Sequence, residues 1–210
     1  DEHDHEDHAD HDEHDHEDHD DHDEHDHDEH DDDEHAHGDH DPHAWLSPDN
    51  GAVWLDVIAA QLATADPENA AAYQSNAEAG RAELTALRTQ IESILAPVRD
   101  RNFIVFHDAY QYFETAFAFP ASGAISVSDA VAPSPARIAE IQARVADQQV
   151  VCVLSEPQFD PGIVAAVMDG SDARTGVLDP LGSDLEPGPL LYPQMLRNLA
   201  TTLADCLGPQ

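Results

Sequence analysis

Histidine is the residue whose number and spacing in this sequence point most directly to chemistry. The 210-residue chain has 16 histidines, and 14 of them lie in residues 1–42 together with 24 Asp and Glu residues. Imidazole nitrogen is a good zinc ligand, and a carboxylate oxygen can complete the coordination shell. Because these histidines are two or three residues apart, a flexible chain can wrap several of them around one ion. We therefore predict many labile metal sites in residues 1–40, with auxiliary ligands that include His30, His35, His37 and His40.

This acidic histidine tract, residues 1–40, is also repetitive. Residues 1–11 read DEHDHEDHADH, and residues 12–22 repeat that unit with one substitution. A coiled coil would need an apolar stripe, which the tract lacks, and like charges at every spacing predict disorder. A purification tag would be an uninterrupted histidine run, and a solvating acidic tail would not need 14 histidines. Metal collection is therefore favoured over both alternatives.

The net charge of the chain limits the classes of partner that it can bind. The formal net charge is −37 with neutral histidine, and all eight basic residues are Arg. Such a charge repels nucleic-acid phosphates and anionic lipid surfaces, so we expect small cations as partners instead. No run of 18 apolar residues occurs, so the sequence predicts no membrane-spanning helix.

Only two histidines, His43 and His107, lie outside the tract. His43 follows Pro42, whose ring restricts the backbone, and the nearby Trp45 can shield a bound ion from water. His107 comes directly after the apolar run NFIVF. A lone histidine is more often structural than a ligand, but two such residues beside a metal-collecting tract favour a second, ordered metal site.

The elements that must position these side chains alternate between strand and helix after residue 99. Apolar runs predict strands at about 102–106, 124–127, 149–154 and 175–178, and helices are predicted to end near 118, 147, 168 and 207. This alternation is typical of an α/β fold with a parallel sheet covered on both faces. Ligands bind at the carboxyl ends of such strands, where His107, Glu156 and Asp179 each follow an apolar run.

Two helices are predicted before the sheet. The first covers about 50–64, starts at Asp49 or Asn50, and has an apolar face made of Val53, Trp54, Val57, Ile58 and Leu62. The second starts at Asp66-Pro67-Glu68 and continues without proline to about residue 96. A helix of about 30 residues is roughly 45 Å long, so it is either a strut between two bodies or one arm of a bundle.

The two cysteines, Cys152 in a predicted strand and Cys206 in the last helix, leave two possibilities open. In a cytosolic protein they would be buried thiols, whereas in an exported protein they would form one disulfide. Because there are no other cysteines, zinc clusters held by several thiolates are excluded.

Five segments together resemble a known family. An acidic histidine-rich loop runs into DPHAWLSP, and FIVFHDAYQYF, CVLSEPQF and VLDPLG follow in that order. This order resembles the zinc-binding substrate-binding proteins of bacterial ABC importers, the cluster A-I or cluster 9 family. The resemblance implies metal ligands at His43 and His107, and an acidic ligand of manganese-binding relatives at Asp179. It also implies that Cys152 and Cys206 are bridged.

The family architecture implies two α/β lobes joined by one long helix, with the metal in the cleft between them. On this pattern residues 1–40 are the disordered tract, 41–66 the end of the N-terminal lobe, 67–98 the linker helix and 99–210 the C-terminal lobe. Family members carry a signal peptide, most of the N-terminal lobe and another histidine ligand ahead of the tract, so the sequence resembles their C-terminal two thirds. We expect the rings of His43 and His107 to approach within about 5 Å.

The function implied is capture of Zn²⁺ in the periplasm and its delivery to the membrane permease of an ABC importer, by a monomer that is not an enzyme. An imidazole at position 107, where manganese-binding relatives have a carboxylate, favours zinc. One alternative is a zinc hydrolase with Glu156 or Asp108 as general base, although HExxH is absent from the sequence. Another is a soluble zinc buffer or chaperone that acts through the tract alone.

Overall fold

The structure, a computed structural model, describes residues 41–126 and 132–209. The tract, with its predicted auxiliary ligands His30, His35, His37 and His40, lies outside these ranges, as does residue 127 at the end of one predicted strand. Within the described residues, no helix is both long enough and apolar enough to cross a lipid bilayer.

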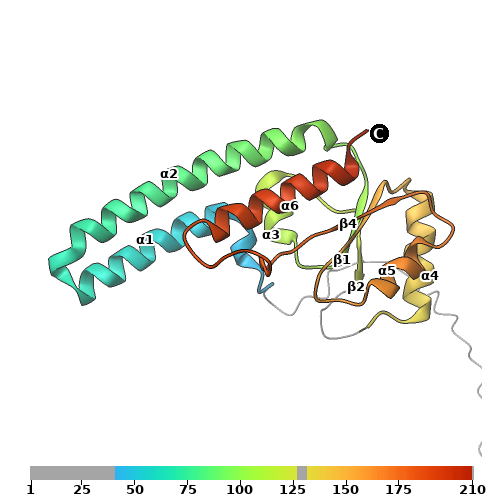
Figure 1. Cartoon of the computed structure of the whole chain (residues 1–210), viewed down its shortest axis with the longest axis horizontal. Helices are drawn as coiled ribbons and strands as arrows, with labels where there is room; N and C mark the ends of the chain where they lie inside the picture. The colour runs from blue at the N-terminus through green and yellow to red at the C-terminus, as the bar shows by residue number, and fades with distance from the viewer. Residues whose placement is uncertain (1–40, 127–131, 210) are drawn as a thin grey trace, which may run out of the picture. The chain divides into compact units, whose positions relative to one another are not determined.

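A parallel β-sheet organises the second half of the chain (Figure 1). Its strands are β1 Phe103–His107, β2 Ala124–Ser126, β3 Cys152–Ser155 and β4 Arg174–Val177. They are arranged in the order β2-β1-β3-β4, and every neighbouring pair is parallel. The predicted α/β fold is therefore confirmed, and all carboxyl ends of the strands lie at one edge.

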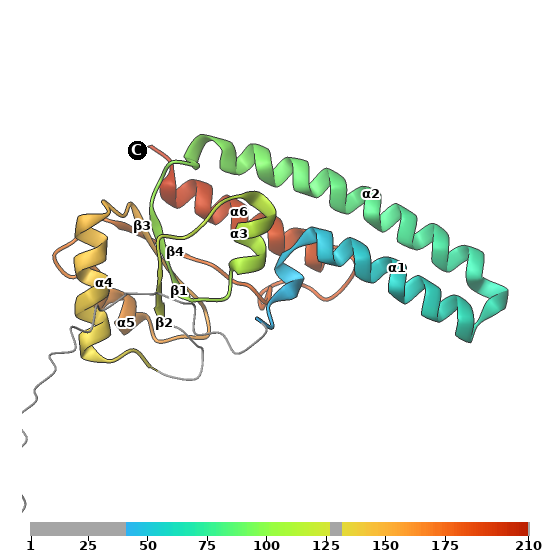
Figure 2. The ribbon, with the colours of Figure 1, turned by 180° about the vertical axis from the view of Figure 1, so that it is seen from behind.

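Helices cover both faces of this sheet (Figure 2). They are α3 Gln111–Phe117, α4 Pro135–Asp147, α5 Pro161–Met168 and α6 Leu191–Leu207. Successive residues of β1 point to opposite faces, so Phe103 and Val105 pack in one core with α3 and α6, and Ile104 and Phe106 pack in the other with α4 and α5. Burial on both faces explains why β1 and β3 read as continuous apolar runs, whereas the edge strand β4 is partly exposed.

Three helices begin with the same local signal, a capping residue followed by proline. Ser134 precedes α4 and its hydroxyl accepts a hydrogen bond from the backbone of Arg137 at 3.2 Å, while Asp160 caps α5 in the same way. The first helix, α1 Pro48–Ala65, is capped by Ser47. The prediction that Asp49 or Asn50 starts this helix was wrong, because Pro48 occupies the first helical position and leaves Ser47 as the cap.

The second helix, α2 Ala70–Leu95, runs antiparallel to α1 and also packs against α6 (Figures 1 and 2). Single 3₁₀ turns, Pro67–Asn69 and Ala96–Val98, extend it at both ends. Gly80 allows the close approach of α1, since a Cβ at this position would lie 2.8 Å from a methyl carbon of Leu55.

The apolar face predicted on α1 is solvent-exposed. Its members, Val53, Trp54, Val57, Ile58 and Leu62, are between 42% and 60% exposed. The contact between α1 and the rest of the described chain uses a different side of the helix, where Gly51 and Ala59 are buried. Helical periodicity identified an apolar face but could not say what covers it.

Cys152 and Cys206 form a disulfide that links β3 to α6. Their Cα atoms are 5.9 Å apart, and the two residues are 54 positions apart in sequence. This confirms the pairing implied by the family resemblance.

Candidate metal centre

His107 is the last residue of β1, so the sheet places it at the carboxyl edge. The residue is only 4% exposed, and it pairs in register with Ser126 of β2. The chain turns immediately afterwards, because the backbone of Ala109 donates a hydrogen bond to the carbonyl of His107 at 2.9 Å. The imidazole is therefore held by a strand end.

His43 lies in the loop that leads into α1. The carboxylate of Asp41 accepts two hydrogen bonds from this residue, one from the backbone N–H at 2.9 Å and one from ring Nδ1 at 2.7 Å. A 3₁₀ turn, Ala44–Leu46, follows at once. Asn50 of α1 also donates to the carbonyl of Ala44, so the loop is held from both ends.

Hydrogen bonds of two aromatic side chains, Trp45 in the loop and Tyr192 in α6, fasten this loop to α6 and to the segment that precedes it. The indole N–H of Trp45 donates to the carbonyl of Pro180 at 2.9 Å, and the hydroxyl of Tyr192 donates to the carbonyls of Trp45 and Ser47. Burial, and then the charge of Asp49, raises the pKa of Tyr192, so its hydroxyl remains a donor in neutral solution. These bonds join residues about 140 positions apart in sequence.

The two imidazoles meet through their Nε2 atoms, which are 3.5 Å apart. The ring centroids are 5.3 Å apart and the ring planes are inclined at 68°. Two zinc–nitrogen bonds of about 2.1 Å at a tetrahedral angle place the nitrogens about 3.4 Å apart. The structure thus brings His43 and His107 together at a separation that fits a shared metal ion.

The other ring nitrogen of each imidazole has a carboxylate partner. Nδ1 of His107 lies 2.7 Å from Oε1 of Glu156, as Nδ1 of His43 does from Oδ1 of Asp41. In a neutral imidazole the nitrogen beside a carboxylate carries the proton, which leaves the Nε2 lone pair free to bind a metal. Of these partners, sequence analysis did not identify Asp41 and placed Glu156 in a different role. The sequence feature that could have indicated Asp41 is its position two residues before His43 in the segment Asp-Pro-His.

A cavity of about 380 Å³ adjoins the two rings. Its walls include His43, His107, Trp45, Phe159 and Pro180. A zinc ion takes four ligands, so this space is where further ligands of an ion held by the two imidazoles would approach.

Tyr110 is a buried residue of the same region. Its hydroxyl lies beside Glu156 but makes no hydrogen bond of acceptable geometry with any described residue. Burial, followed by the negative charges of Glu156 and Asp179, raises the pKa of this hydroxyl well above its usual value. Tyr110 is therefore a neutral donor near the site.

Asp179 is held within its own loop. Its carboxylate accepts hydrogen bonds from the backbone of Leu181, Gly182 and Ser183 at 3.0, 2.9 and 2.6 Å, and from the Ser183 hydroxyl at 2.8 Å. Among residues 41–126 and 132–209, no group of three or more His, Cys, Asp or Glu side chains forms a metal cluster. Coordination of a metal by Asp179 therefore stays a prediction.

The loop that begins at Asp179 should be less stable in acid. Burial raises the pKa of this carboxyl, but the hydrogen bonds from Ser183 and the backbone outweigh burial, so the pKa is lowered overall. Its contribution to stability is present above the unfolded-state pKa of about 3.9 and is lost as pH falls through the folded-state pKa. We expect Asp179→Asn to lower the free energy of unfolding by about 1 kcal/mol at pH 7.

Urea unfolding at several pH values would test this expectation. The difference between Asp179→Asn and the unmodified protein should shrink as the pH approaches 2. A variant as stable as the unmodified protein at pH 7 would show that the loop does not depend on this carboxylate.

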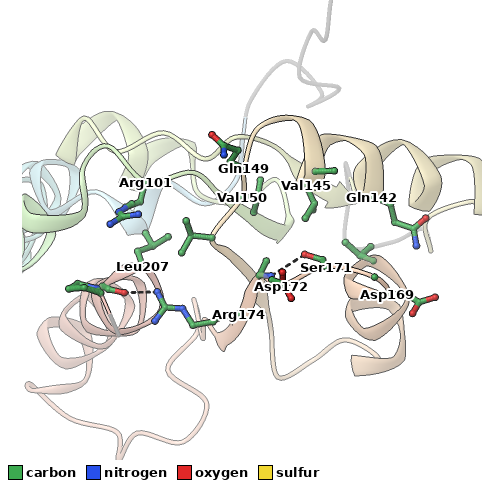
Figure 3. A pocket seen from close by; sticks show the side chains of 17 residues that line it. Arg101, Gln142, Val145, Gln149, Val150, Asp169, Ser171, Asp172, Arg174 and Leu207 are labelled. Atoms are coloured by element: carbon green, nitrogen blue, oxygen red, sulfur yellow. Dashed lines mark hydrogen bonds between the residues drawn. The ribbon is translucent and has the colours of Figure 1, made fainter.

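A second cavity, of about 700 Å³, lies at the opposite edge of the sheet (Figure 3). It is lined by residues next to the amino ends of the strands, such as Arg101, Val150 and Arg174. Arg174 donates to the carbonyl of Gly208 at 2.6 Å, and the acids Asp169 and Asp172 line the same space. This cavity is therefore separate from the two imidazoles.

Comparison with solved structures identifies the class of protein. A crystal structure of ZnuA matches with a TM-score of 0.69 at 28% identity, over 80% of this chain and 62% of that chain. A zinc-bound ZnuA with residues 138–173 deleted matches with a TM-score of 0.68 at 29% identity, over 81% of this chain and 62% of that one. The substrate-binding protein FpvC from Pseudomonas aeruginosa, in complex with Mn²⁺, matches with a TM-score of 0.69 at 25% identity, over 79% of this chain and 60% of that chain. The fold is therefore that of metal-binding substrate-binding proteins.

Sequence relatives narrow the class to one family. The high-affinity zinc uptake system protein ZnuA of Brucella abortus (strain 2308) is 52% identical over 165 residues, which are 79% of this chain and 49% of the relative. That of Paracoccus denitrificans (strain Pd 1222) is 44% identical over 168 residues, 80% of this chain and 52% of the relative. The family described as ZnuA, zinc-uptake complex component A, periplasmic, matches residues 1–206, and the chain belongs to it. The chain spans about half the length of these curated relatives.

Proposed function

We propose that this chain captures Zn²⁺ at His43 and His107 in the periplasm and delivers it to the permease of an ABC zinc importer. The observation that carries the proposal is the pair of Nε2 atoms 3.5 Å apart, each on a ring whose Nδ1 is bound to a carboxylate. The Brucella and Paracoccus relatives are high-affinity zinc uptake system proteins, which supports the same metal.

Zinc suits the chemistry of this pair. Two neutral imidazoles favour zinc over the harder cations Mg²⁺, Ca²⁺ and Mn²⁺, which prefer oxygen ligands. The two buried carboxylates beside the rings supply negative charge near the ion without occupying a coordination position. The remaining positions face the adjoining cavity, and Asp179, which directly precedes the cavity residue Pro180, is one candidate ligand.

Capture and release, rather than hydrolysis, fits the surroundings of the site. A zinc hydrolase needs a general base with a free oxygen beside metal-bound water. Glu156, one sequence candidate for that role, accepts a hydrogen bond on each of its oxygens, from His107 and from Gln158. We therefore propose a monomeric carrier that performs no reaction on its cargo.

The acidic histidine tract and the paired histidines should form two classes of zinc site. Deletion of residues 1–40 should remove several weaker sites and leave one tight site, because the tract ligands are interchangeable whereas His43 and His107 are held by the fold. Isothermal calorimetry with Zn²⁺, on the chain with and without the tract, would measure both the stoichiometry and the affinities.

The same titration separates the carrier from the zinc buffer. Salt should weaken only the tract sites, since exposed charges are screened beyond about 8 Å at physiological ionic strength. If the deletion removed all zinc binding while the rest of the chain stayed folded, the tract alone would be the working part.

A further inference from the structure

Glu156 is a buried acidic residue with an unusual set of neighbours. It follows β3 directly, and because β3 pairs with β1, it lies beside His107 at the carboxyl edge of the sheet. Its side chain has no exposed surface. Oε1 lies 2.7 Å from Nδ1 of His107 and 3.4 Å from the backbone nitrogen of the same residue, and Oε2 accepts from the Gln158 amide at 2.7 Å.

These contacts define the state of the carboxylate. The contacting atoms, Nε2 of Gln158 and the backbone nitrogen of His107, are donors, so the oxygens of Glu156 act as acceptors. An isolated buried carboxylate would be strongly destabilising, and hydrogen bonds of this kind offset that cost. The third partner, Nδ1 of His107, must then carry a proton, and the proton is absent from Nε2 of the neutral ring.

The geometry points to Glu156 as a positioning residue of the metal site. It holds His107 in the Nδ1-protonated tautomer, with the bare Nε2 directed at His43. Asp41 makes the same contact to His43, but from only two residues away in the same loop and with its second oxygen unpartnered among the described residues. Glu156, fixed on the sheet and fully buried, is therefore the stronger of the two constraints.

A merely structural carboxylate would also join β3 to β1, so the test must read the imidazole itself. The metal-free full chain, labelled with ¹⁵N, reports the tautomer of each ring through its nitrogen chemical shifts. Signals of His43 and His107 can be assigned by their loss in His43→Gln and His107→Gln. In mildly alkaline buffer, we expect His107 of the unmodified protein to be protonated on Nδ1 and bare on Nε2.

The decisive variant is Glu156→Gln, which keeps the size of the side chain and removes its charge. An amide NH₂ can donate to Nδ1, so we expect a substantial Nε2-protonated population of His107 and a zinc affinity about 10- to 100-fold lower. The matched control is Glu140→Gln on α4, an exposed carboxylate paired with Arg137 and Arg144, which should change neither readout.

The outcomes distinguish failure of the positioning role of Glu156 from failure of the proposed zinc capture. An unchanged tautomer and unchanged zinc affinity in a folded Glu156→Gln protein would overturn the proposal. If that variant did not fold, an Nε2-protonated His107 in the unmodified protein would overturn it equally. The affinity effect rests on the proposed zinc capture, but the tautomer does not. A shifted tautomer, with zinc affinity insensitive even to loss of His107, would support positioning by Glu156 and refute zinc capture at this pair.

Discussion

Replacement of His107 by alanine should abolish tight zinc binding. The substitution removes one of the two Nε2 atoms that face each other at 3.5 Å. Structural zinc sites release about 10–16 kcal/mol through four ligands, so loss of one imidazole should weaken binding by at least about 100-fold. Competition with a chromophoric zinc chelator would measure the loss of affinity. The measurement uses the chain without residues 1–40 if this shortened chain still has the tight site. If it does not, the measurement uses the full chain.

A second substitution separates ligand loss from loss of stability. Alanine at position 107 leaves the buried Glu156 carboxylate without its ring donor, so the protein should also become less stable. Asparagine at the same position can still donate to Glu156 but has no atom where Nε2 lies. His107→Asn should therefore lose the tight site with a smaller loss of stability, and retention of tight binding in both variants would refute the site.

Removal of the disulfide should produce the largest loss of stability. The bridge closes a segment of 54 residues, and the chain-entropy model assigns such a loop about 4 kcal/mol. Both cysteines are buried, and the bond holds α6 against β3. We expect Cys152→Ala/Cys206→Ala to lower the free energy of unfolding by about 4 kcal/mol, which corresponds to about 10 °C in Tm.

Denaturant unfolding with and without reductant would measure this effect. Reductant should destabilise the unmodified protein and leave the double alanine variant unchanged. Two free thiols in protein isolated from an oxidising compartment would contradict the bridge and weaken the assignment to the periplasm.

Most of the secondary structure could be predicted because its signals are local. Cap-proline pairs such as Ser134-Pro135 and Asp160-Pro161 mark helix starts within two residues, and apolar runs mark the buried strands β1 and β3. The predicted strand at 149–154 began too early, since Gln149 has a left-handed backbone and β3 starts at Cys152. Such boundaries depend on the neighbouring strand, which a local pattern does not include.

The candidate ligands were predictable for a different reason. Histidine is absent from the sequence after residue 43 except at position 107, so residue type alone was enough to select His43 and His107 as candidate ligands. The resemblance of DPHAWLSP and FHDAY to family motifs added the prediction that each is a metal ligand.

Only the tertiary structure decided how these residues are supported. Glu156 reaches His107 because β3 lies beside β1, Trp45 reaches Pro180 across 135 positions, and Asp179 is engaged by its own loop. The exposure of the α1 apolar face is likewise a property of what packs against that helix. Residue type and short-range spacing determine which side chains can bind a metal and where helices and strands form. Sheet order and long-range contacts bring the two Nε2 atoms face to face and place the Glu156 carboxylate beside Nδ1 of His107.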